Sequence, residues 1–238
     1  MSSTSERHAG AANFTPPERI EVYLTARGER RLLNRLCRAL PAWMMPDHLS
    51  AIGFFGAAVS GLSYVAANGS PWFFWLSSVG LLINWFGDSL DGSLARYRKT
   101  ERPRYGYFVD HSLEVINYCC LFVGLGLSPY IPMNVALIAL IGILLMHVYT
   151  LMSNHLSENF NATVFNLGPT ELRLVFVYLN TVMFFRGPLR WGFLGFPFSP
   201  YVVGVTVMGA IFIGIFLVDV FVLARKLRRE NGRISLDS

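Results

Sequence analysis

Six long apolar runs constrain the fold of this chain more than any other feature of its sequence. Each run is long enough to cross a hydrocarbon core of about 30 Å as a helix. None shows the alternating pattern of a strand, and helices satisfy their own backbone hydrogen bonds in lipid. The sequence therefore predicts an all-α integral membrane protein with six transmembrane helices. They cover approximately residues 48–67, 71–95, 106–128, 131–153, 169–186 and 200–224.

Composition supports a membrane protein. Charged residues make up 15% of the 238 residues, whereas a soluble domain carries about 25%. Hydrophobic residues make up 53%, which excludes disorder for most of the chain. The net charge of +5 comes from basic residues beside the apolar runs, and no basic and aromatic residues interleave on a soluble face. We therefore expect contacts with membrane lipids and none with nucleic acid.

The apolar runs divide the chain into four parts. Residues 1–17 are rich in Ser, Thr, Ala and Gly and are predicted to be a disordered cytoplasmic tail. Residues 18–45 place leucines at helical spacing with arginines between them, which predicts an amphipathic helix in the membrane interface, preceding the six spans. The alternative for this segment is a helix packed on the protein core. Residues 46–225 form the six-helix membrane domain, and residues 226–238 form a basic cytoplasmic tail.

Basic residues also predict the orientation. Arginines and lysines gather at 96–104, between the second and third runs, and again after the sixth run. The connectors around 68–70 and 128–130 carry no charge. The positive-inside rule then places both termini and the 96–105 loop in the cytoplasm. The connector from Arg186 to Arg190 is the exception, since it is an outer loop with positive charge.

Four carboxylates lie at the edges of the second and third runs. Asp88 and Asp91 are three residues apart, and Asp110 and Glu114 are four apart, so each pair shares a helix face. A charge inside a membrane costs at least about 2.5–3.5 kcal/mol, and clustered acids repel one another. Divalent cations such as Mg²⁺, Mn²⁺ or Ca²⁺ solve both problems. The alternatives are an ion-coupled transporter and helix pairs neutralised by arginine.

The spacing of these acids resembles the motif of the CDP-alcohol phosphotransferase family. That motif is D-x-x-D-G-x-x-A-R followed by G-x-x-x-D-x-x-x-D. Seven of its eight fixed positions match, and the eighth is Glu114 where the family has Asp. A six-helix membrane domain with an N-terminal interfacial helix is what the family implies. The matching positions are Asp88, Asp91, Gly92, Ala95, Arg96, Gly106 and Asp110.

The resemblance implies a membrane transferase. It would move a substituted phosphoryl group from a CDP-linked donor to an acceptor hydroxyl on an alcohol or lipid, and release CMP. Two divalent ions, Mg²⁺ or Mn²⁺, would be held by Asp88, Asp91 and Asp110, with Glu114 contacting metal and acting as the base. Gly92, Ala95 and Gly106 would leave room for the nucleotide, and Arg96 would help to hold it. The family also implies a homodimer with a cytoplasmic active site.

Two shorter resemblances involve other residues. The segment from Pro46 to Ser50 looks like the P-N-x-L-T of the family, with Asp47 in place of the Asn near the nucleotide; alternatively, Asp47 is an ordinary residue of a helix start. The segment from Gly168 to Glu171 and the Asp110-His111 pair resemble the choline and ethanolamine phosphotransferase branch. This favours a small CDP-linked head group and a diradylglycerol-like acceptor. Glu171 can equally be a first-turn acid favoured by the helix dipole.

Several assignments stay open. Arg98, Arg102 and Arg104 could bind an acceptor phosphate, as in the inositol-phosphate branch, or form a solvated loop that attracts anionic lipids. His111 could support the metal site, serve as an alternative base or simply pack. A transporter and an inactive homologue acting as a partner subunit remain the alternatives to the transferase. The sequence does not decide whether the donor or the acceptor carries the lipid.

Overall fold

The computed structural model describes residues 26–156, 168–188, 191–193 and 196–234. Within these ranges the chain forms seven helices and one short hairpin of two antiparallel strands. The helices are α1 (Ala26–Ala39), α2 (Pro46–Ala66), α3 (Phe73–Arg98), α4 (Pro103–Gly126), α5 (Met133–Leu156), α6 (Pro169–Arg186) and α7 (Pro200–Ile234), and the strands are β1 (Trp191–Phe193) and β2 (Phe196–Phe198).

The helices α2 to α7 correspond in order to the six predicted runs. The prediction of an all-α fold is confirmed for the described residues, apart from the hairpin between α6 and α7. The largest difference is α7, which continues to Ile234 where the apolar run stops at residue 224. Its last turns contain arginines and a lysine, and these residues favour helix and suit its C-terminal end.

Four of these helices are long and apolar enough to cross a membrane, namely α2, α4, α5 and α7. Six such helices were expected. The helices α3 and α6 also have 26 and 18 residues, but charged side chains interrupt them. Asp88 and Asp91 lie in α3, and Glu171 and Arg173 lie in α6. These helices are less apolar because they carry polar residues into the site, and their spanning of the membrane stays a prediction.

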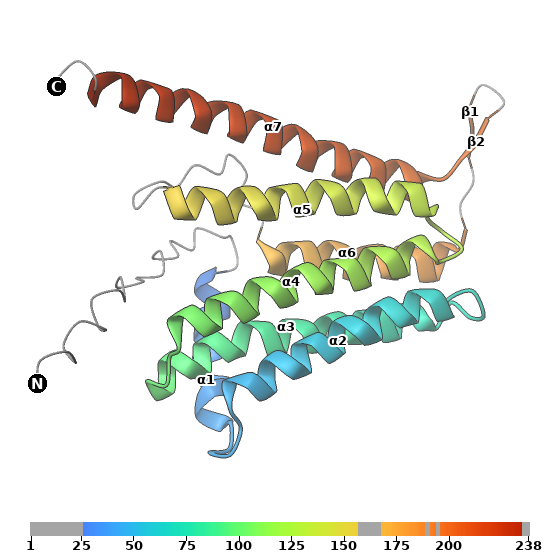
Figure 1. The fold of residues 1–238 in the computed structure, drawn as a ribbon. Helices are drawn as coiled ribbons and strands as arrows, with labels where there is room; N and C mark the ends of the chain where they lie inside the picture. The colour runs from blue at the N-terminus through green and yellow to red at the C-terminus, as the bar shows by residue number, and fades with distance from the viewer. Residues whose placement is uncertain (1–25, 157–167, 189–190, 194–195, 235–238) are drawn as a thin grey trace, which may run out of the picture.

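The bundle has two recognisable ends (Figure 1). α1, the connection between α3 and α4, and the C-terminal end of α7 lie at one end, while the connection between α2 and α3 and the β1–β2 hairpin lie at the other. The basic segments of the sequence therefore gather at one end of the bundle. α7 is the outermost helix and packs along α5.

Glycines allow α2 and α3 to pack very closely. A methyl group on Gly56 would collide with the backbone of α3, and one on Gly87 would collide with the backbone of α2. Small residues at helix crossings allow such close approach of two backbones in membranes. Asn84 in α3 reinforces the contact, since its Nδ2 donates a hydrogen bond of 2.9 Å to the carbonyl of Gly53. α2 also packs against α4, so α2 connects the two helices that carry the motif.

The main apolar core joins α2 through α7. Tyr64, Phe74, Phe122 and Phe176 are buried at its centre. The buried Tyr64 hydroxyl donates a hydrogen bond of 2.7 Å to Oδ1 of Asn180. A buried tyrosine hydroxyl usually has such a partner. The core therefore fixes the relative positions of the helices around the site.

A second, smaller core fixes α1. Cys37 of α1 is 2% exposed and packs with Leu49, Leu90 and Leu94. The arginines of α1 whose side chains are described, Arg30, Arg31, Arg35 and Arg38, are all exposed. A helix is present over Ala26–Ala39, within the segment predicted to be amphipathic, and it packs against α3. Its place in the membrane interface stays a prediction, and residues 18–25 and the predicted tail over 1–17 lie outside the described residues.

Candidate active site

Three of the four motif acids line one cavity. Asp88 and Asp91 of α3 and Asp110 of α4 surround it, together with Ser50 and Asn117. The chain reverses sharply between these helices, since α3 ends at Arg98, Lys99 adopts a left-handed conformation with φ of 56°, and Pro103 opens α4. This short connection brings the two halves of the motif together at the same end of the bundle.

Asp91 is held by two neutral donors. Ser50 Oγ donates to Asp91 Oδ2 at 2.6 Å, and the backbone N–H of Gly92 donates to Asp91 Oδ1 at 2.5 Å. Ser50 belongs to α2, so this hydrogen bond also joins α2 to α3. The carboxylate is therefore fixed in position before any ligand binds.

Asp88 has a charged partner. Arg173 of α6 donates from Nη2 to Asp88 Oδ2 at 2.6 Å and from Nε to Asn84 Oδ1 at 2.8 Å. The side chains of Arg173 and Asp88 are 13% and 21% exposed. A guanidinium held at two points in this way is oriented as well as paired.

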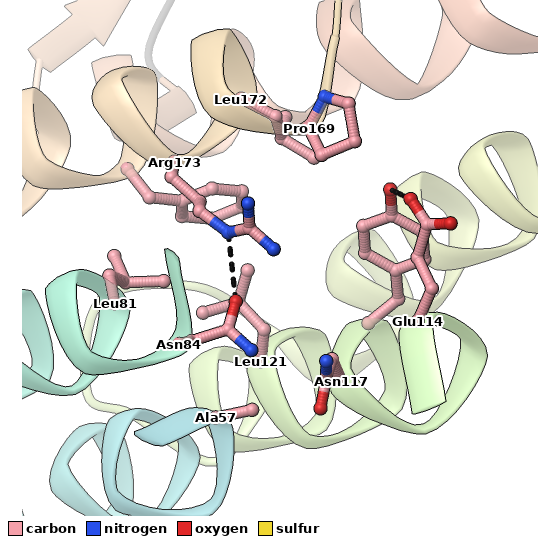
Figure 2. A pocket seen from close by; sticks show the side chains of 11 residues that line it. Ala57, Leu81, Asn84, Glu114, Asn117, Leu121, Pro169, Leu172 and Arg173 are labelled. Carbon is pink, nitrogen blue, oxygen red and sulfur yellow. Dashed lines mark hydrogen bonds between the residues drawn. The ribbon is translucent and has the colours of Figure 1, made fainter. Parts of the chain in front are cut away.

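Glu114 faces a second cavity (Figure 2). This cavity is lined by Glu114, Asn84, Asn117 and Arg173 with apolar walls, and the other three acids do not line it. Tyr118 donates its hydroxyl hydrogen to Glu114 Oε1 at 2.8 Å, and His147 Nδ1 of α5 lies 3.5 Å from Glu114 Oε2. The fourth acid thus borders a different cavity from the three aspartates.

Asn117 lies between the two cavities and lines both. Its Oδ1 is buried without a hydrogen-bond partner among the described residues, as is Nε2 of His147. The cavity beside the aspartates has a volume of about 10 Å³, and the one beside Glu114 about 20 Å³. A water molecule needs roughly 10–15 Å³ by this measure. Each cavity therefore has room for about one water molecule, and neither can enclose a ligand as large as a nucleotide.

The chemistry of the aspartate cavity suits a divalent cation. Carboxylate oxygens are the ligands that Mg²⁺ and Mn²⁺ prefer, and three of them converge on one cavity with a serine hydroxyl. Among the described residues, no three His, Cys, Asp or Glu side chains lie close enough together to hold an ion. The donor set fits the cation in kind, and the Asp88 oxygen that contacts Arg173 could bind a metal only if the arginine released it.

The small residues of the motif leave space at this end of the bundle. A methyl group on Gly106 would meet nothing within 4 Å, and one on Gly92 would meet only the Arg96 guanidinium. Ala95 is half-buried and Arg96 is exposed, with Nη2 3.4 Å from Ser93 Oγ. The predicted nucleotide residues therefore face open space beside the aspartate cavity.

The basic residues of the loop differ in their contacts. Arg98 donates to the backbone carbonyls of the connection between α1 and α2, including that of Met44. Arg102 pairs with Asp47 at 2.5 Å on the exposed surface, and this hydrogen bond raises the pKa of the Arg102 guanidinium. Arg104 is exposed. Arg98 therefore joins the end of α3 to the connection between α1 and α2, and Asp47 and Arg102 form an ion pair.

His111 and Glu171 also have local contacts. His111 Nδ1 lies 2.8 Å from the carbonyl oxygen of Tyr107 and 3.9 Å from Asp110 Oδ2. Glu171 Oε2 accepts from the backbone N–H of Gly168 at 3.1 Å. Glu171 thus accepts a hydrogen bond at the start of its own helix, and His111 lies beside the third aspartate.

Sequence reasoning missed three residues that hold the site together. Arg173 and His147 lie in other helices than the motif, and no spacing along the chain connects them to Asp88 or Glu114. Glu29 of α1 is the third, since its Oε1 accepts from Trp85 Nε1 at 2.7 Å, Ser89 Oγ at 3.2 Å and Thr170 Oγ1 at 3.1 Å. The presence of an arginine within an apolar run was the one available signal for Arg173.

Comparison with known proteins identifies the family. The family model described as CDP-alcohol phosphatidyltransferase matches residues 43–222. The chain belongs to this family. It is also 24% identical over 195 residues to cholinephosphotransferase 1 of Danio rerio, an alignment that covers 77% of this chain and 46% of the relative. The chain thus matches about half the length of that relative. The four apolar helices and the membership of this family indicate an integral membrane protein.

Proposed function

We propose that this protein transfers a substituted phosphoryl group from a CDP-linked donor to an acceptor hydroxyl, with release of CMP, in phospholipid biosynthesis. The observation that supports this most directly is the convergence of Asp88, Asp91 and Asp110 on one cavity of a chain that belongs to this family. In the reaction the acceptor oxygen bonds to the phosphorus that bears the donor's alcohol. The bond from that phosphorus to the CMP oxygen breaks.

The enzyme would use two divalent ions, Mg²⁺ or Mn²⁺. Asp88, Asp91 and Asp110 would hold them, with Glu114 as the fourth acid of the motif. When bound, such ions neutralise the negative charge on the diphosphate and on the departing CMP. Ser50 would fix Asp91 for this purpose through its hydrogen bond of 2.6 Å.

Glu114 would serve as the base that takes the proton from the acceptor hydroxyl. Its carboxylate is oriented by Tyr118 and His147, and it borders a cavity of about 20 Å³ that could receive a hydroxyl group. Asn117, which lines both cavities, would then contact the hydroxyl between the base and the aspartates. A base positioned within hydrogen-bond reach can contribute about 10²–10⁴-fold to the rate.

The nucleotide would lie outside the cavities at the same end of the bundle. Gly92, Ala95 and Gly106 leave open space there, and Arg96 is exposed beside it. Arg96 can pair with a phosphate in the bidentate manner that guanidinium groups favour. Asp47 and Arg102 border the same end and could separate to contact the nucleotide.

The donor would carry a small head group, and the acceptor would be a diradylglycerol-like lipid. The similarity to a protein named cholinephosphotransferase favours phosphocholine as the transferred group. The apolar walls of the Glu114 cavity are compatible with a lipid acceptor. The reverse arrangement, with CDP-diacylglycerol as donor and a polar alcohol as acceptor, uses the same chemistry and is the second candidate.

The active site would face the cytoplasm, and the protein would form a homodimer. The basic segments lie at the end of the bundle that holds the aspartates, as the positive-inside rule requires of a cytoplasmic end. The homodimer rests on the family resemblance. Four helices satisfy the length and composition of a span, and α3 and α6 would complete a six-span domain.

The deciding experiment measures CMP release by the purified protein. A panel of CDP-choline, CDP-ethanolamine and CDP-diacylglycerol is supplied with matching acceptors in Mg²⁺-containing micelles. We expect CMP in proportion to new lipid product with one donor. An ion-coupled transporter, or an inactive homologue acting as a partner subunit, would release no CMP with any donor. The variant Asp91→Asn serves as the inactive control.

A further inference from the structure

Arg173 stands out because it lies outside the motif and pairs with one of the three aspartates. It extends from α6 to Asp88 at 2.6 Å, while Asp91 is held by a hydroxyl and a backbone N–H. Asp110 lies 3.9 Å from His111. Asp88 is thus paired with an arginine, whereas neutral donors hold Asp91.

The position of Arg173 is built by several helices. Its Nε donates to Asn84 Oδ1 at 2.8 Å, and Asn84, which is 4% exposed, donates from Nδ2 to the carbonyl of Gly53. Asn84 and Asp88 are one helical turn apart on α3, so one guanidinium contacts both. The chain of contacts from α2 through α3 to α6 keeps the positive charge at the boundary of the two cavities.

From this geometry we infer that Arg173 is the built-in cation that balances Asp88 when no divalent ion is bound, and that it competes with such an ion for this carboxylate. The inference rests on the proposed function, since it assumes that the three aspartates hold a divalent cation. A carboxylate buried in a membrane bundle needs a counter-charge. A guanidinium 2.6 Å from Asp88 also repels a divalent cation that approaches the same oxygens.

Arg173 is a positioning residue in this scheme. It holds the Asp88 carboxylate through Oδ2 in the metal-free protein, and it must release that oxygen if the metal is to bind there. Removal of its charge should therefore have two opposite effects. The metal-free protein should become less stable, because Asp88 loses its partner, and the affinity for a divalent ion should rise.

The test is Mn²⁺ binding to the purified protein in micelles without any CDP-linked donor. The electron paramagnetic resonance signal of free Mn²⁺ gives the affinity. We expect Arg173→Gln to bind Mn²⁺ about tenfold more tightly than the wild type, and Arg173→Lys, which keeps the charge, to stay within about threefold of it. The matched control is Arg186→Gln, at the exposed other end of the same helix, with unchanged affinity.

Thermal unfolding provides a second measurement, and it can be made on a double variant even if Arg173→Gln folds poorly. In excess chelator, Arg173→Gln should melt below the wild type, and saturating Mn²⁺ should restore most of the loss. If Arg173→Gln cannot be purified, the double variant Asp88→Asn with Arg173→Gln should be more stable in chelator than Asp88→Asn alone, because no buried charge is then left unpaired.

The outcomes separate this inference from the proposed function. It is overturned if Arg173→Gln binds Mn²⁺ no more tightly than the wild type, if neither protein binds Mn²⁺, if Mn²⁺ gives the variant no extra stability, or if the double variant is no more stable than Asp88→Asn. CMP release by the wild-type protein is a separate measurement. It can succeed while the Mn²⁺ experiment fails, in which case only the role of Arg173 is lost.

Discussion

Tyr118, which lies one helical turn after Glu114 on α4, donates its hydroxyl hydrogen to Glu114 Oε1 at 2.8 Å. His147 of α5 approaches the other carboxylate oxygen at 3.5 Å. Glutamate is one methylene longer than the aspartate of the family motif, and these two partners direct its carboxylate into the second cavity. The glutamate at position 114 is therefore matched to Tyr118 and His147, which hold its longer side chain in place.

Glu114 provides the sharpest test of the catalytic proposal. Glu114→Gln should lose about a hundredfold or more of kcat, because an amide keeps the shape but cannot accept the proton. The affinity for the donor should change little, since the nucleotide binds elsewhere. Steady-state kinetics of CMP release separate the two quantities. Turnover at the wild-type rate would remove Glu114 as the base, and His111 would be tested next.

Tyr118 and the length of the side chain refine this prediction. Glu114→Asp restores the family residue but places the carboxylate about one bond short of Tyr118. We expect it to keep part of the activity and lose the rest to misplacement. Tyr118→Phe should lower kcat less than Glu114→Gln does, because it removes one orienting hydrogen bond. A larger loss with Tyr118→Phe would contradict this order.

Metal removal is the second prediction. Chelation should abolish turnover, and Mg²⁺ or Mn²⁺ should restore it. Asp91→Asn and Asp110→Asn should be inactive at all metal concentrations, because an amide lacks the charge that balances the cation. Full activity in excess chelator would contradict the two-metal proposal. Glu101→Gln, an exposed acid in the neighbouring connection, is the control and should keep full activity.

The third prediction concerns Ser50, whose hydroxyl donates a hydrogen bond to Asp91 from the neighbouring helix. Residues that orient a metal ligand in this way are typically worth about 10–100-fold in metal affinity or activity. We expect Ser50→Ala to raise the Mg²⁺ concentration needed for half-maximal activity by about tenfold, whereas Ser50→Thr retains the hydroxyl and most of the activity. Equal Mg²⁺ dependence of the wild type and Ser50→Ala would show that this hydrogen bond has no part in the site.

The order and type of the helices could be predicted from the sequence, because each helix from α2 to α7 forms from one apolar run. The grouping of Asp88, Asp91 and Asp110 could also be predicted, since spacing on two consecutive helices and one short turn determine it. Contacts between distant helices could not. Arg173 reaches Asp88 across 85 residues of chain and His147 comes from α5, and only the packing of α5 and α6 brings them there.

The division of the four acids between two cavities could not be predicted from the sequence. The position of Glu114 four residues after Asp110 predicts a shared pocket, because both lie on one face of α4. In the structure the same face borders two cavities, and Asn117 lies between them. Helical spacing determines which residues share a face of the helix. The packing of the neighbouring helices determines which cavity each of those residues borders.

Topology is the fourth prediction. Thr100 lies in the exposed turn after α3, at the basic end of the bundle. In a background without the three native cysteines, Thr100→Cys should react with a membrane-impermeant thiol reagent only from the cytoplasmic side. Asn68→Cys, in the connection between α2 and α3 at the opposite end, should react only from the outside. Labelling of position 100 from the outside would invert the proposed orientation.

The last prediction concerns the close contact of α2 and α3 that supports the site. A methyl group at Gly87 would collide with the backbone of Leu49 and Gly53, and backbone atoms cannot move aside as a flexible side chain can. Gly87 precedes Asp88, and Gly53 lines the cavity of the three aspartates, so a forced separation of the helices would displace the carboxylates. Gly87→Ala should therefore cost about 1–3 kcal/mol of stability and most of the activity.

Gly214→Ala in α7 is the matched control, since a methyl group there meets nothing within 4 Å, and it should melt and turn over like the wild type. Thermal unfolding in micelles and CMP release measure the two effects. If Gly87→Ala matches the control in both, then α2 and α3 do not approach as closely in the membrane as the structure indicates, and the hydrogen bond from Asn84 to the carbonyl of Gly53 cannot hold Arg173 as described.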